Sequence, residues 1–81
     1  MFVKVKFFRK SAMGYVGTEY TYETDLPLKA MDKVLVPAGA GGKNRAIVTA
    51  VNVPERDINP DYFPLKRITE YDEEVETDGN N

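Results

Sequence analysis

The chain has 81 residues, a net charge of −2, and no cysteine, histidine or tryptophan. This length allows one small domain with a correspondingly small core. The missing cysteines exclude disulfides and thiol catalysis, and the missing histidines remove the commonest general base and transition-metal ligand. Ser11 therefore has no histidine to activate it, and we expect neither enzyme activity nor a cofactor or metal site.

Phe2 begins a run in which apolar and basic residues alternate, and a second alternating run covers residues 18–24. This period of two, with β-branched and aromatic residues, predicts two antiparallel strands with one buried face each. The face expected in the core carries Val3, Val5, Phe7, Tyr20 and Tyr22. On the other face, we expect Lys4 and Lys6 to lie across from Glu19 and Glu23 as cross-strand pairs of opposite charge.

The second half of the chain predicts three further strands. Residues 33–37 indicate a buried strand, the Gly-rich residues 38–44 a hairpin loop, and residues 45–53 a central strand that Pro54 ends. A single helical or 3₁₀ turn is expected from Pro60 to Tyr62, before a last strand over residues 65–71. No stretch predicts a long helix, so the expected fold is all-β: a small SH3-like or OB-like five-stranded barrel.

Acidic residues gather at the C-terminus. The last ten residues contain five acids and no base, so the first 71 carry a net charge of +3. The acids are Asp72, Glu73, Glu74, Glu76 and Asp78. We therefore predict a domain over residues 1–71 and a disordered acidic tail over residues 72–81. The tail is interpreted either as a solubilising segment or as one that competes with an anionic ligand for a basic face.

The middle of the chain has a recognisable order of motifs. A Tyr-x-Tyr strand precedes a turn into a buried strand, then a Gly-rich loop and a returning apolar strand. The residues that carry this order are Leu28, Asp32, Val34, Val36, Pro37, Ala46, Ile47, Val48 and Val51. The order is similar to the N-terminal DNA-binding domain of the primosomal replication-restart helicase PriA, and to small phage and prophage proteins of Gram-positive bacteria. No helicase motif accompanies it, so the resemblance implies an isolated binding module.

Basic and aromatic residues define the first candidate site, for weak and salt-sensitive binding of DNA or RNA. Its residues are Lys4, Lys6, Arg9, Lys10, Lys43, Arg45 and Tyr15. The Gly-rich loop beside Lys43 does not have the spacing of a nucleotide-binding P-loop, because Asn44 follows the lysine and a strand comes next.

The second candidate is a protein-interaction or assembly module. The loop over residues 57–64 carries Ile58, Tyr62 and Phe63, which we expect to be exposed and to dock on a host or phage protein, or on a second copy of the chain. No secretory signal pattern and no run of 18 apolar residues is found, so a cytoplasmic location is expected, in the host cell if the chain is phage-encoded, with no membrane partner.

Overall fold

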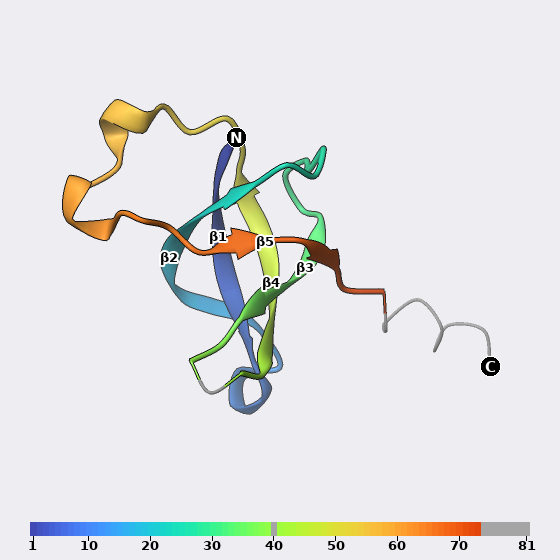
Figure 1. Cartoon of the computed structure of the whole chain (residues 1–81). Helices are drawn as coiled ribbons and strands as arrows, with labels where there is room; N and C mark the ends of the chain where they lie inside the picture. Colours follow the sequence, from blue (N-terminus) through green and yellow to red (C-terminus); the bar gives the residue numbers. More distant parts are fainter. Residues whose placement is uncertain (40, 74–81) are drawn as a thin grey trace.

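Six strands form one mixed sheet in the computed structural model, which describes residues 1–39 and 41–73 (Figure 1). The strands are β1 (Phe2–Arg9), β2 (Gly14–Thr24), β3 (Lys33–Pro37), β4 (Lys43–Ala50), β5 (Arg67–Ile68) and β6 (Glu70–Tyr71). Their order across the sheet is β5-β2-β1-β4-β3-β6. Neighbouring strands are antiparallel except for β2 and β5, which are parallel. The all-β prediction is confirmed.

The two outermost strands are consecutive in the chain. Only Thr69 separates β5 from β6, yet β5 pairs with β2 at one edge of the sheet and β6 pairs with β3 at the other. The five-stranded barrel that we expected, closed or partly closed, is therefore corrected to an open sheet of six strands. The predicted last strand over residues 65–71 splits at Thr69, where the chain crosses from one edge to the other, so no continuous hydrogen-bonded ladder closes the sheet.

Side-chain alternation along the strands builds the core. The buried cluster contains Val3, Val5, Tyr22, Leu28, Val34, Val36, Ala46, Val48 and Ile68. Because successive side chains of a strand point to opposite faces, the neighbouring residues lie on the outer face of the sheet. The predicted inward positions of Val3, Val5 and Tyr22 are confirmed, and Phe7 packs against the cluster. The expected core position of Tyr20 is wrong, because its side chain is exposed.

Loops and short 3₁₀ turns connect the strands: η1 (Lys10–Ala12), η2 (Glu55–Asp57) and η3 (Pro60–Tyr62). The predicted turn at Pro60 is confirmed, and the Asn59 side chain caps it by accepting a hydrogen bond from the Asp61 amide at 2.9 Å. β2 begins earlier than predicted because residues 14–16 pair with β1. Gly17 adopts φ 96° near the register shift between these two strands, a conformation that favours glycine.

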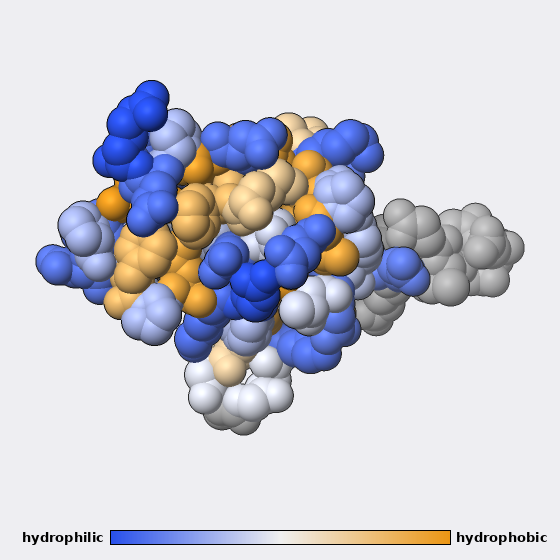
Figure 2. All heavy atoms as spheres, turned by 45° about the horizontal axis from the view of Figure 1, so that its top comes forward, coloured by the Kyte–Doolittle hydropathy of each residue, from blue (hydrophilic) through white to orange (hydrophobic). Residues whose placement is uncertain are grey.

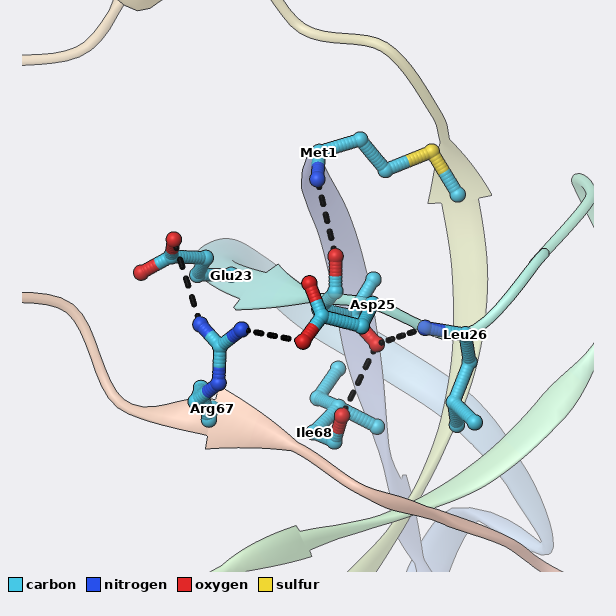
Figure 3. Close-up of polar contacts among 7 residues, drawn as sticks. Met1, Glu23, Asp25, Leu26, Arg67 and Ile68 are labelled. Atoms are coloured by element: carbon cyan, nitrogen blue, oxygen red, sulfur yellow. Dashed lines mark hydrogen bonds and ion pairs between the residues drawn. The ribbon is translucent and has the colours of Figure 1, made fainter.

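A buried threonine fixes β5 to the end of β2. The Thr24 hydroxyl donates to the Ile68 carbonyl at 2.8 Å and accepts from the Leu26 amide at 3.0 Å. Arg67 adds ion pairs to Glu23 at 3.1 Å and to Asp25 at 2.6 Å (Figure 3). The contacts of Thr24 with Ile68 and of Arg67 with the two acids join residues more than 40 positions apart and hold the C-terminal segment against the sheet.

The predicted boundary of the acidic tail shifts by at least one residue. Asp72 is buried and its carboxylate lies 2.9 Å from Arg45, so this residue is part of the fold. Residues 74–81 of the predicted tail lie outside the described residues. Within residues 1–39 and 41–73, no helix is long and apolar enough to cross a membrane.

Candidate functional site

The outer face of the sheet brings together part of the predicted basic site. Lys4 and Lys6 lie there on β1, half-buried, and Tyr15 of β2 lies beside the Phe8 ring with 5.4 Å between ring centroids. The Arg45 guanidinium stands 4.8 Å from the centroid of the same Phe8 ring, which is a cation–π contact. Basic and aromatic side chains therefore adjoin on three neighbouring strands.

The expected charge pairing between β1 and β2 is not formed. The register places Lys4 opposite Thr21, and Glu23 pairs with Arg67 instead. Lys4 and Lys6 make no ion pair with any residue in the described part of the chain.

The remaining predicted cations lie elsewhere or are paired. Arg9 ends β1 and Lys10 begins η1, at the end of the sheet where the β3–β4 loop also lies (Figure 1). Lys43 forms an exposed ion pair with Glu70. Arg45, which we placed beside a flexible loop, sits inside the β3–β4 ladder and pairs with the buried Asp72. A nucleic acid that used these two cations would have to compete with both carboxylates.

The predicted protein-interaction residues separate into one buried and two accessible side chains. Ile58 is 6% exposed, so its expected exposure is wrong: the 3₁₀ turns on either side fold it inward. Tyr62 is 61% exposed, and Phe63 makes an edge-to-face contact with Phe2 at 5.8 Å. Figure 2 shows hydrophobic residues gathered on the face that carries the N-terminus, with hydrophilic residues around them.

A groove of about 440 Å³ runs beside β2. One wall consists of residues 18–22 of β2, and the other of Tyr62 and residues 64–66, which lead from η3 to β5 (Figure 1). The volume falls within the range of about 300–1,000 Å³ that is typical of ligand sites. Tyr20, which is 44% exposed and stacked on Phe7 at 4.9 Å, lines the groove together with Tyr62.

The groove follows an open edge of the sheet. β5 pairs with β2 only at Glu23 and Thr24, so within residues 1–39 and 41–73 no strand pairs with the outer edge of β2 over residues 14–22. We did not predict this open edge from the sequence. The alternation of side chains predicts that β2 is a strand, but it does not indicate which of its edges is left without a pairing strand.

Burial raises the pKa of Tyr22 above the usual value of about 10, and the nearby Tyr20 adds to the shift. The folded protein thus binds this phenolic proton more tightly than the unfolded chain does. Stability is unaffected below about pH 10 and falls as the pH rises from there through the raised pKa.

We expect Tyr22→Phe to lessen this alkaline loss of stability. Urea midpoints of both proteins, measured at about pH 8 and about pH 11 on either side of the usual tyrosine pKa, test the expectation. The midpoint of the natural sequence should drop further between the two pH values. An equal drop in the two proteins would show that Tyr22 does not titrate differently on unfolding.

The described part of the chain contains no cluster of carboxylates that could hold a metal ion. A comparison of the chain with protein-family models, curated proteins and solved structures finds no match. The resemblance to the PriA domain and to phage proteins therefore stays a prediction.

Proposed function

We propose that this protein is a non-enzymatic protein-interaction module, and that the groove beside β2 is its docking surface. The observation that carries the proposal is a groove along an open strand edge with an exposed tyrosine on each wall: Tyr20 on β2 and Tyr62 in η3. Aromatic side chains dominate binding energy at protein interfaces because they bury large areas at little conformational cost.

A second candidate function, weak binding of nucleic acid, is favoured by the outer face. Lys4 and Lys6 of β1 and Lys33 of β3 lie on this face without an ion pair to the described residues, and Phe8 of β1 contacts Tyr15 of β2. Phosphate contacts by such lysines give salt-sensitive affinity without sequence preference. This candidate ranks second because two of the predicted cations, Lys43 and Arg45, are paired with acids.

The proposal is tested by selecting ligands from a random-peptide display library on the immobilised protein and measuring their affinity for variants. Tyr62→Ala should weaken the selected peptides at least tenfold, because the exposed ring forms one wall of the groove. The matched control is Tyr71→Ala, which removes an exposed tyrosine from β6 at the opposite edge of the sheet and should leave affinity unchanged.

The same proteins are titrated with a single-stranded oligonucleotide at about 20 mM salt, where charges are least screened. Binding that Lys4→Glu with Lys6→Glu abolishes, and that Tyr62→Ala leaves intact, would establish the second candidate. Failure of the library to yield any peptide sensitive to Tyr62→Ala would overturn the first.

A further inference from the structure

β5 is itself a short strand that adds to the outer edge of β2. Arg67 lies opposite Glu23 and Ile68 opposite Thr24, and the Glu23 amide donates to the Lys66 carbonyl at 3.0 Å. The pair has a simple chemistry: the basic Arg67 binds the acid on the outer face, while the apolar Ile68 enters the core (Figure 3). After these two residues the added strand ends.

The same chemistry continues along β2 where no strand covers it. Side chains alternate between the two faces, so Glu19 follows Glu23 on the outer face and the rings of Tyr20 and Tyr22 follow Thr24 on the inner face. Glu19 is exposed and makes no ion pair within the described part of the chain. The open edge therefore presents the Glu19 carboxylate on the outer face and the exposed Tyr20 ring on the inner face, next to the two positions where β5 pairs.

Space for a longer added strand exists beside this edge. The chain that leads into β5 forms the turn η3 and then the far wall of the groove, so it does not pair with residues 18–22. Pro64 lacks a backbone N–H, so it cannot donate a ladder hydrogen bond from that wall. An incoming backbone would consequently find its hydrogen-bonding partners on β2.

From these observations we infer that the groove takes an extended segment of a partner protein as an added strand on β2, and that this segment alternates basic and apolar residues. This inference rests on the proposed function and specifies its ligand. Backbone hydrogen bonds to residues 18–22 supply affinity. A lysine or arginine opposite Glu19 repeats the pairing of Arg67 with Glu23, and apolar side chains contact Tyr20 and Tyr62.

The positive charge of Lys66 does not oppose this assignment. Lys66 directly precedes the pair of Arg67 with Glu23, so continuing this parallel register by one residue brings it beside Tyr22. Tyr22 is three residues from Glu19, which corresponds to about 10 Å along the strand. A Debye length at physiological salt is about 8 Å, so Lys66 acts weakly on a cation bound at Glu19. The basic residue of the partner is therefore expected at the open end of the groove.

Three synthetic peptides test the inference: one of alternating valine and lysine, one of alternating valine and glutamate, and a copy of the first with alternate backbone amides methylated. Binding is followed through the amide resonances of residues 18–22. The lysine peptide should bind at least tenfold more tightly than the glutamate peptide. Methylation should abolish its binding, because it removes the N–H groups that pair with β2 while keeping the side chains.

Glu19→Lys should reverse the preference, so that the glutamate peptide binds more tightly than the lysine peptide. Glu19 is exposed, so the variant should fold normally. The control is Glu55→Lys, the same change of charge at an exposed position in η2 outside this groove, which should keep the original preference. Reversal in Glu19→Lys alone supports the inference.

Two results would overturn the inference while sparing the proposed function. One is equal affinity for the methylated and unmethylated lysine peptides at the groove, which would show docking without strand addition. The other is a preference for the lysine peptide that Glu19→Lys leaves unchanged.

If no peptide, including those from the display library, perturbs residues 18–22, both the inference and the proposed function fail. A dimer joined through β2 would also overturn the inference, because a second copy would then be the occupant.

Discussion

Ile68→Ala is expected to lower the free energy of unfolding by about 3 kcal/mol, within the range of about 2–5 kcal/mol for truncating a buried isoleucine. Ile68 is 1% exposed and belongs to the core cluster, although β5 contributes only two residues to the sheet. A small domain has a total stability of only about 5–15 kcal/mol, so this loss is large. Urea unfolding followed by circular dichroism measures it.

The conservative variant Ile68→Val serves as the control. It removes one methylene and should cost only about 1 kcal/mol, because most of the packing is kept. A loss below about 1 kcal/mol for Ile68→Ala would contradict the structure, since it would mean that the C-terminal segment is not anchored in the core. Because β5 fixes one end of the groove beside β2, a folded Ile68→Ala protein should also bind groove ligands less tightly.

Residues 33–37 and 60–62 form elements that could be predicted from the local sequence. Lys33–Pro37 is observed with the bounds that were predicted, because alternation begins it and the Gly-rich loop follows its proline. The turn Pro60–Tyr62 was predicted from the proline and from the asparagine before it, which caps the turn. Both features depend on neighbours in the chain, so the sequence alone is sufficient to place them.

The predictions that were wrong concern contacts between residues that are far apart in the chain. The period-two pattern of residues 65–71 predicts a strand, but it carries no information about which edge each half pairs with. Ile58 was expected on the surface because it lies in the loop over residues 57–64, whereas the fold turns it inward. The open edge of β2 could likewise not be predicted from the sequence. It exists because β5 pairs with β2 at only two residues.

The predicted nucleic-acid site combined basic residues with Tyr15, and the structure separates its cations into two groups. Lys4 and Lys6 share the outer face of β1, while Lys43 and Arg45 are held by Glu70 and by Asp72. Both of these ion pairs join residues 27 positions apart. A count of basic residues cannot anticipate such pairs, so it overestimates the charge that is open to a ligand.

Arg45→Glu is expected to destabilise the protein by about 3 kcal/mol, the low end of the range of about 3–5 kcal/mol for breaking a buried ion pair, because only the Asp72 side of this pair is fully buried. The Asp72 side chain is 1% exposed and lies 2.9 Å from the guanidinium, so the substitution sets a second carboxylate beside a buried one. The cation–π contact with Phe8 is lost as well.

Lys43→Glu, the same reversal of charge two residues earlier, faces the half-exposed Glu70 and should cost about 1 kcal/mol or less. Urea unfolding of the two variants at low and high salt compares these effects. Equal and small losses in both would show that the Arg45–Asp72 pair contributes no more to stability than a surface contact does.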